Sequence, residues 1–203
     1  MRKGSDDSTA ARSPPCQVLR DEHGVILRVL RVLEKLLERV EIGREFPFDA
    51  FAKCVEFFEL FADACHHAKE EGVLFPALEG RGMTRLGGPL GVMLFEHRLA
   101  RDFVRRMAES LAEYRANVEQ AREHFLRAAR GYLEVLVPHI HKEDQCLFAM
   151  ADRLLAGEAG LEVRAGFEAA ACHRYDGRNA LELRQLAAEI EAEGAKGLAA
   201  NRR

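Results

Sequence analysis

Two segments of this chain carry the same chemical pattern and align without gaps. HHAKEEGVLFPAL begins at His66, and HIHKEDQCLFAMA begins at His139. In each, a glutamate follows the first histidine by four residues, so Glu70 corresponds to Glu143. This spacing brings an imidazole and a carboxylate to one face of a helix, about one turn apart. The fold must therefore let two helices present matching His and Glu side chains.

Helical periodicity covers almost the whole chain. Ala, Leu, Glu and Arg dominate every long segment, whereas Val, Ile and Thr rarely cluster, so strand signals are absent. Four long helices are expected, over residues 17–41, 47–80, 89–117 and 117–155. We therefore predict an all-α fold, an up-down-up-down four-helix bundle.

Tails and an extension are expected on either side of this bundle. Residues 1–16 are rich in Ser, Asp, Arg and Pro and predict a flexible N-terminal tail. Residues 17–155 form the predicted bundle. Residues 156–203 predict a short C-terminal helical extension, with weaker helices over about 161–173 and 179–193, followed by a tail.

Two local sequence signals concern the fourth predicted helix. Asn117, with Gln120 three residues later, is typical of a helix N-cap and its box partner, and Pro138 predicts a kink or local irregularity in the fourth helix.

The apolar stripes are expected to continue beyond the two glutamates. In the second helix they continue through Val73 and Ala77, and in the fourth through Cys146 and Met150.

Histidines on all four predicted stripes fall at matching depths. If the helices alternate in direction, His23 and His66 both lie about 18 residues, or ~27 Å, from the turn between the first two helices. His97 and His139 likewise lie about 20 and 22 residues from the next such turn, at ~1.5 Å per residue. One layer of the bundle is thus expected to contain His23, His66, Glu70, His97, His139 and Glu143.

Carboxylates on apolar stripes need compensation. Burying an unpaired carboxylate costs several kcal/mol, and a metal ion bound by the neighbouring imidazoles offsets that cost. Imidazole with carboxylate suits Fe, Mn or Zn better than Ca or Mg. Facing helices of a bundle are a known setting for two-metal centres. A single histidine on a stripe would more simply be a core residue, and a metal-free interaction bundle is the alternative.

The sequence resembles the hemerythrin-like (HHE cation-binding) domains, bacterial relatives of the oxygen-carrying hemerythrins, over residues 17–155. The motifs that carry the resemblance are Glu22-His23, HHAKEEGVLFPAL, Glu96-His97 and HIHKEDQCLF. The resemblance implies two non-haem Fe ions with histidine ligands and bridging carboxylates, which bind or react with O₂, peroxide or nitric oxide. Mn or Zn are alternative metals. The ligands implied are His23, His66, Glu70, His97, His139 and Glu143.

Departures from the family pattern leave choices open. The oxygen-carrying hemerythrins place two histidines one turn apart on the third helix, whereas this chain has Met93 and Arg101 around His97. One metal would then have fewer protein ligands, leaving a position for water, another carboxylate or substrate. Glu71 and Asp144 are second choices for the carboxylate ligands, because His67/Glu71 repeats the spacing and His139/Asp144 fits the longer hemerythrin spacing.

Polar side chains near the predicted ligands have alternative roles. His67 and His141 either orient the ligands or face solvent, and Arg101 either orients a carboxylate or makes a surface ion pair. Lys69 and Lys142 are expected to extend to solvent. Further expectations are packing for Tyr132, a structural or surface role for His124 and His173, and small-hydrophobe roles for Cys54, Cys65 and Cys146.

Two classes of function follow from these residues. The leading hypothesis is a non-enzymatic di-iron protein that binds O₂ or a related diatomic for sensing, storage or iron handling. The alternative is a di-iron enzyme that decomposes peroxide or reduces nitric oxide, because the absence of a second histidine on the third helix could leave an open coordination position. A sensor would need an unidentified signalling partner, and a homodimer is another expected form.

Composition bounds the location and the partners. The formal net charge is −3, which argues against a nucleic-acid partner, and no apolar run approaches the ~20 residues of a membrane span. The basic N-terminus lacks an apolar segment typical of a secretory signal. The five cysteines form no C-x-x-C pair, so no disulfide framework is expected. We predict a cytoplasmic protein without a membrane partner.

Overall fold

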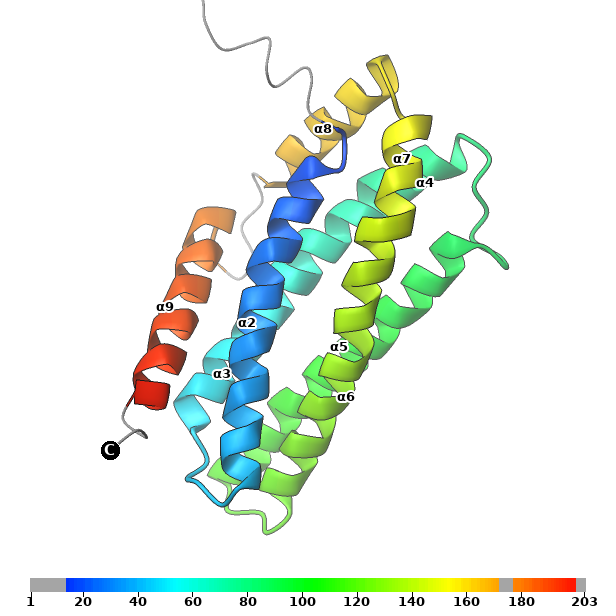
Figure 1. The fold of residues 1–203 in the computed structure, drawn as a ribbon. Coiled ribbons are helices and arrows are strands. Elements are labelled where there is room, and N and C mark those ends of the chain that lie inside the picture. Colours follow the sequence, from blue (N-terminus) through cyan, green and yellow to red (C-terminus); the bar gives the residue numbers. More distant parts are fainter. Residues whose placement is uncertain (1–13, 172–176, 200–203) are drawn as a thin grey trace, which may run out of the picture.

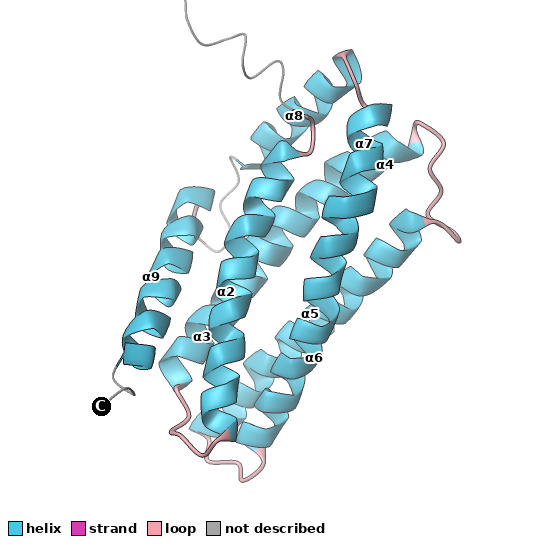
Figure 2. Ribbon diagram, viewed as in Figure 1, coloured by secondary structure: helices cyan, strands magenta, loops and turns pink. Residues whose placement is uncertain are grey.

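The computed structural model describes residues 14–171 and 177–199, and every regular element in these ranges is a helix (Figures 1 and 2). The predicted all-α class is therefore confirmed. Residues 1–13 of the predicted N-terminal tail lie outside the described residues, as do Cys172, His173 and residues 200–203.

Four long helical rods lie side by side, and the chain reverses direction at each connecting loop (Figure 1). The first rod is α2 (Gln17–Glu41) and the third is α5 (Pro89–Arg115). The second and fourth rods each combine α-helical with π-helical segments. The second comprises α3 (Phe48–Phe57), η1 (Phe58–His67), η2 (Glu70–Leu74) and α4 (Phe75–Glu79). The fourth comprises α6 (Ala121–Lys142), η3 (Glu143–Leu147) and α7 (Phe148–Leu154).

The apolar core is divided in two by a polar layer. The larger cluster includes Ile26, Phe58 and Ile140, and the smaller includes Leu19 and Phe148. Buried polar side chains lie between the two clusters. They are Glu22, His23, His66, His67, Lys69, Glu70, His97, His139 and Glu143. Apolar packing on both sides thus keeps bulk water away from this layer.

The π-helical segments shift the buried stripes by one residue. Both η2 and η3 begin at the glutamate of the repeated motif. A π-turn takes up one more residue than an α-turn, so the face toward the core moves one position along the chain. The stripe of the second rod accordingly continues at Leu74 and Leu78, and that of the fourth at Leu147.

Four positions of the expected stripes are less buried than expected, and the expectation is wrong for one of them. Val73, Ala77 and Met150 are only partly buried but still pack against the smaller apolar cluster. Cys146 is exposed, so it does not act as a small core hydrophobe, whereas Cys54 and Cys65 are buried as expected.

The turn between α5 and α6 also differs from its prediction. Asn117 does not cap α6, whose N-cap is Gln120 without a side-chain cap bond. Asn117 instead has φ of 58° just beyond the end of α5, and the next amide, that of Val118, donates to the carbonyl of Glu113. This left-handed closing turn is common at helix C-termini, and asparagine tolerates it better than most residues. Pro138 lies within α6, and the nearest irregularity is η3.

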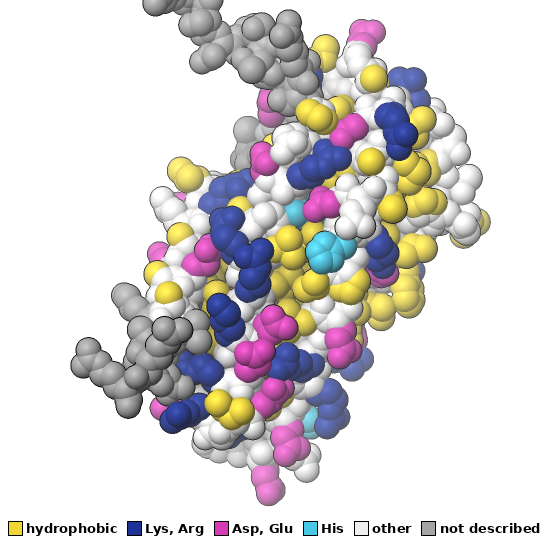
Figure 3. All heavy atoms as spheres, viewed as in Figure 1, with side chains coloured by type: hydrophobic (Ala, Val, Ile, Leu, Met, Phe, Trp, Pro, Cys, Tyr) yellow, Lys and Arg dark blue, Asp and Glu magenta, His cyan; other side chains and the backbone are white. Residues whose placement is uncertain are grey.

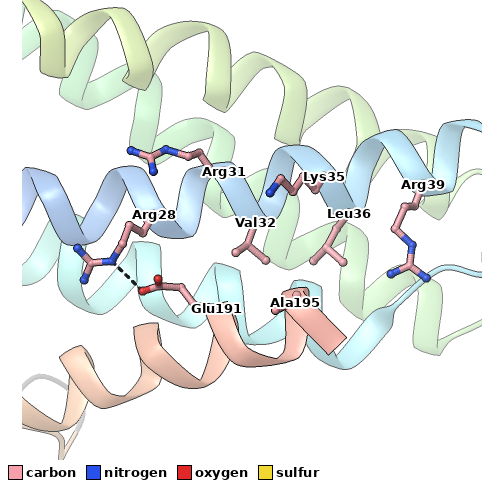
Figure 4. Close-up of a pocket in the computed structure, with 9 residues that line it drawn as sticks. Arg28, Arg31, Val32, Lys35, Leu36, Arg39, Glu191 and Ala195 are labelled. Atoms are coloured by element: carbon pink, nitrogen blue, oxygen red, sulfur yellow. Dashed lines mark hydrogen bonds and ion pairs between the residues drawn. The ribbon is translucent and has the colours of Figure 1, made fainter. Parts of the chain in front are cut away.

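Two further helices lie against the rods. α8 (Glu158–Ala171) follows the fourth rod, and α9 (Ala180–Ala199) runs along α2 and α3 (Figure 1). α9 approaches α2 closely where Gly194 faces Val32, because a Cβ on this glycine would lie 2.8 Å from the valine Cγ1. Arg28 Nε donates to Glu191 at 2.9 Å across the same contact (Figure 4).

The surface carries a basic row that the sequence analysis missed. Arg28, Arg31, Lys35 and Arg39 line a pocket of about 220 Å³ between α2 and α9 (Figure 4). On the adjacent face, hydrophobic side chains gather in the groove between α2 and α6 (Figure 3). Among the described helices, none combines the length and hydropathy that a membrane crossing requires.

Candidate metal centre

All six predicted ligand residues meet in the polar layer, and all are buried. His23, on α2, places Nε2 3.2 Å from Glu143 Oε2, and His139 places Nε2 at the same distance from that oxygen. Glu70 lies between His66 and His97, whose Nε2 atoms are 3.5 and 3.4 Å from its two carboxylate oxygens. The four rods thus bring six side chains to one point, with the two carboxylates in the middle.

The side chains form two groups that share one carboxylate. His23, His66, Glu70 and Glu143 form one group, in which the four ligand-type atoms lie within 4.8 Å of one another. The second group meets the same distance criterion and consists of His67, Glu70, His97 and His139. Because Glu70 belongs to both groups and each of its oxygens faces a different one, the geometry suits a carboxylate shared by two cations.

His67 is the residue that the sequence analysis did not include among the ligands. It is buried, its ring stacks on His97 with centroids 4.0 Å apart, and its Nδ1 lies 3.3 Å from Asp63 Oδ1. The third helix has a single histidine in the cluster, and His67 of the second rod supplies the additional imidazole. A signal was present, because His67 aligns with the core residue Ile140 in the repeat.

Buried atoms of ligand type lack hydrogen-bond partners at this point. They are Nε2 of His23 and His66 and both carboxylate oxygens of Glu70 and Glu143. Buried polar atoms are almost always satisfied in native proteins, and an unsatisfied carboxylate is especially costly. The concentration of six such atoms in one place therefore fits bound cations, and the donor set suits Fe, Mn or Zn.

An outer carboxylate holds each of the four predicted histidine ligands. His23 Nδ1 donates to Asp144 at 2.8 Å, and His66 Nδ1 donates to Glu22 at 3.0 Å. In the same way, His97 Nδ1 donates to Glu71 at 2.8 Å, and His139 Nδ1 donates to Glu96 at 2.9 Å. Since the carboxylates only accept, each Nδ1 carries the hydrogen, which leaves Nε2 as the nitrogen that would bind a metal.

These bonds also join neighbouring rods in a closed ring. Glu22 and His66 connect the first rod to the second, and Glu71 and His97 connect the second to the third. The bond of His139 to Glu96 connects the fourth rod to the third, and that of His23 to Asp144 closes the ring between the fourth and the first. Glu71 and Asp144, the alternative ligands considered above, here bond Nδ1 and orient the histidines.

The two repeat lysines occupy different environments. Lys142 is 44% exposed and pairs with Glu96, in line with the expected extension to solvent. Lys69 is only 2% exposed, pairs with Glu22 and lies 3.3 Å from Cys65 Sγ, so the expectation for this residue is wrong. Glu22 on another rod explains the difference, because a buried ammonium is tolerated when a carboxylate compensates it.

Arg101 binds two of the outer carboxylates. Its Nε donates to Asp63 at 2.7 Å and a terminal nitrogen donates to Glu71 at 2.8 Å. These acids bond His67 and His97, so Arg101 contacts the centre through residues that hold its imidazoles, and it contacts neither Glu70 nor Glu143 in any bond that the structure records.

The remaining candidates lie outside the cluster. His141 is exposed, and His124 is half-exposed and pairs with Glu113 at 3.1 Å, as expected for a surface residue. Tyr132 is buried against Phe58, which agrees with the packing role.

Burial and neighbouring charges shift the pKa values of several side chains in the cluster. Burial lowers the pKa of His23 and His97, but bonds to carboxylates outweigh it and raise these pKa values to about 9 and about 11. Burial and the neighbouring imidazoles hold the pKa of His67 well below its usual range. Burial would raise the pKa of Glu143, yet the surrounding histidines lower it well below the usual range.

The metal-free protein should become less stable as pH rises above neutrality. Because His23 and His97 bind protons more tightly when folded, their contribution is full below about pH 6.5 and is lost as pH rises through the folded-state pKa values. Between about pH 7 and 8.5 the free energy of unfolding should fall by on the order of 2 kcal/mol. Urea unfolding in the presence of a chelator measures this slope. His23→Gln should make it shallower, and an unchanged slope in that variant would contradict the explanation.

Comparison with known proteins agrees with this geometry. The family model described as the hemerythrin HHE cation binding domain matches residues 15–151. The chain is 26% identical over 160 residues to the uncharacterized protein Rv1995 of Mycobacterium tuberculosis and, equally, to the uncharacterized protein Mb2018 of Mycobacterium bovis. These alignments cover 77% of this chain and 62% of each relative, so the chain spans about three fifths of their length. No solved structure matches the chain significantly.

The family match covers all four rods as far as Ala151 in α7, including every side chain of the cluster. The chain belongs to the hemerythrin HHE cation-binding domain family.

Proposed function

We propose that this protein binds two iron ions in the polar layer and uses them to bind O₂ or a related small oxidant or diatomic. The observation that carries the proposal is the set of six buried ligand-type atoms without hydrogen-bond partners. The family membership supports cation binding, and the mixture of imidazole and carboxylate favours iron, with Mn or Zn as alternatives. The scaffold in this proposal is an up-down-up-down four-helix bundle.

Each group of side chains would hold one ion. His67, His97 and His139 would bind one ion, and His23, His66 and Glu143 the other, with Glu70 shared by both groups. When bound, the ions would supply a redox-active centre with affinity for O₂, peroxide or nitric oxide. The outer carboxylates fix the imidazole orientation, and the two apolar clusters keep bulk water out of the layer. A cytoplasmic location, and a signalling partner or a second copy of the chain, belong to the same proposal.

The position of His67 weakens the sequence argument for an enzymatic function. The alternative of a peroxide-decomposing or nitric-oxide-reducing enzyme depended on the lack of a second histidine on the third helix. His67 places an imidazole beside His97 from the second rod, so the group around His97 and His139 contains three imidazoles. The absence of a second histidine on the third helix is therefore no longer a reason to prefer turnover over binding.

Metal analysis combined with absorption spectroscopy tests this proposal. Protein produced with ample iron should contain about two iron ions per chain, and O₂ or peroxide should change its near-ultraviolet absorption. Well under one ion per chain, with no such absorption, would contradict it.

Consumption assays on the loaded protein separate the two functions. Reversible O₂ binding without consumption of peroxide or nitric oxide is expected. Steady-state consumption of either substrate would replace the binding function with the enzymatic one.

A further inference from the structure

The internal repeat extends beyond the ligands and relates two surface grooves. It pairs the second rod with the fourth and α2 with α5, since Glu22-His23 corresponds to Glu96-His97. The groove between η1 and α5 therefore corresponds to the groove between α6 and α2. The two grooves differ at positions where the two halves of the internal repeat carry different residues.

The groove between η1 and α5 contains a pocket that reaches His67, one residue of the cluster. We call this the His67 pocket. It has a volume of about 230 Å³, and its lining includes Phe58, Asp63, His67, Arg101, Val104 and Tyr132. Asp63 and Arg101 are 32% and 37% exposed, whereas the His67 side chain is 3% exposed. The pocket thus connects solvent with a candidate metal ligand.

The corresponding groove between α6 and α2 stops short of the centre. Its lining includes Leu27, Leu30, Leu133, Val137 and Pro138, and it contains none of the clustered ligand residues. Hydrophobic side chains gather along it (Figure 3). Ile140, which stands where the other half has His67, is buried in the core beneath.

Three substitutions within the repeat account for this difference. His67 corresponds to Ile140, Asp63 to Leu136, and Arg101 to Leu27. In the His67 pocket Asp63 accepts hydrogen bonds from both His67 and Arg101, so the three polar side chains form one hydrogen-bonded chain. These three polar residues therefore line only one of the two corresponding grooves.

Charges in the His67 pocket are largely paired. Arg101 is bonded to Asp63, and Arg105 to Glu109. Partial burial, with Glu56 nearby, raises the pKa of Glu59, the carboxylate left outside these pairs. The walls between the ion pairs are apolar, with Val104 and Ala100 from α5. A paired, partly apolar passage of this size suits a small uncharged molecule better than an ion.

We infer that the His67 pocket is the port through which a small uncharged ligand, such as a diatomic gas or hydrogen peroxide, reaches the metal centre. The groove between α6 and α2 is a closed counterpart. This inference rests on the proposed function for the identity of the centre, but the accessibility of His67 through the pocket is a property of the chain alone.

A matched pair of substitutions tests the port. Val104→Phe narrows the His67 pocket, and Val137→Phe adds the same bulk to the corresponding groove. In iron-loaded protein, Val104→Phe should slow nitric oxide association at least about tenfold, whereas Val137→Phe should change it less than about twofold. Iron content and helical circular dichroism should stay at the wild-type level in both variants.

Chemical modification of metal-free protein provides a readout that needs no iron. Diethyl pyrocarbonate acylates accessible neutral imidazoles, and mass spectrometry locates the modified residues. Val104→Phe should reduce modification of His67 several-fold and leave that of exposed His141 unchanged. If iron fails to bind but His67 behaves in this way, the proposed function is wrong and the access route to His67 stands.

Opposite results would overturn the port. Equal rates in Val104→Phe and wild type, or equal slowing by the two phenylalanine variants, would show that ligands enter elsewhere. If Val104→Phe does not fold, Val104→Ala should widen the passage and speed association, and Ala108→Phe should obstruct its outer part. Unchanged rates in both of these variants would contradict the inference equally.

Discussion

Replacing Glu70 by alanine should empty both metal positions, whereas removing a histidine from one group should empty only one. Glu70 is the residue that both groups share, and its two oxygens face His66 and His97 separately. We expect Glu70→Ala to retain well under one of about two iron ions, because neither position keeps its bridging ligand. Iron analysis after gel filtration measures the loss.

Variants that lose a ligand from only one of the two groups are the controls for the iron loss in Glu70→Ala. His23→Ala and His67→Ile each affect one group, so each should retain about one ion per chain. His67→Ile introduces the residue that the repeat has at the corresponding position. Glu34→Ala, which removes an exposed carboxylate from α2, should keep the full content. Equal losses in Glu70→Ala and His23→Ala would argue against the assignment of Glu70 to both groups.

Removing Glu22 should destabilise the protein far more than removing its repeat counterpart Glu96. Both glutamates accept from a ligand histidine and pair with a lysine. Lys69 is buried, so Glu22→Ala strands an ammonium in the interior, at a cost of about 3–5 kcal/mol in the free energy of unfolding. Lys142 is 44% exposed, so water can solvate it in Glu96→Ala, and the loss should be about 1 kcal/mol or less.

Measuring metal affinity separates the loss of folding stability from the loss of the carboxylate that orients a ligand histidine. Each substitution frees the Nδ1 of one ligand histidine, so both variants should bind metal roughly 10- to 100-fold more weakly. Chemical denaturation of the metal-free proteins gives the stability difference, and competition with a chelator gives the affinities. Similar unfolding energies for the two variants would contradict the role assigned to Lys69. Restored stability in Glu22→Ala/Lys69→Met would support it.

The bonds to Glu22 also determine how its contribution to stability depends on acid pH. Desolvation alone would raise the pKa of Glu22, but the bonds from His66 and Lys69 lower it to about 2. Its stabilising contribution is therefore complete above about pH 4.5 and disappears as pH falls toward 2.

The helices were predictable because their signals are local. Apolar periodicity predicts bounds close to those observed for α2 and α5. The π-turns at the two glutamates were not predictable from an α-helical period. They displaced the stripes toward Leu74 and Leu147.

The environments of the buried residues around the site were not predictable from the sequence, because they depend on contacts between rods. Lys69 looked like a surface lysine, because nothing in its own segment reveals that Glu22 lies opposite. For a similar reason the sequence predicts only an orienting or exposed role for His67, since its neighbour His97 comes from another helix. The alignment of His67 with the core residue Ile140 in the repeat was a sequence signal that His67 is buried.

The ring of imidazole–carboxylate bonds has a mechanical consequence. Every rod both gives and receives a bond in this ring, directly beside the position proposed for the ions. Separating any two neighbouring rods at this level therefore tilts an imidazole that faces the centre. We therefore expect opening motions of the bundle at this level to be coupled to the release of a cation from the proposed site.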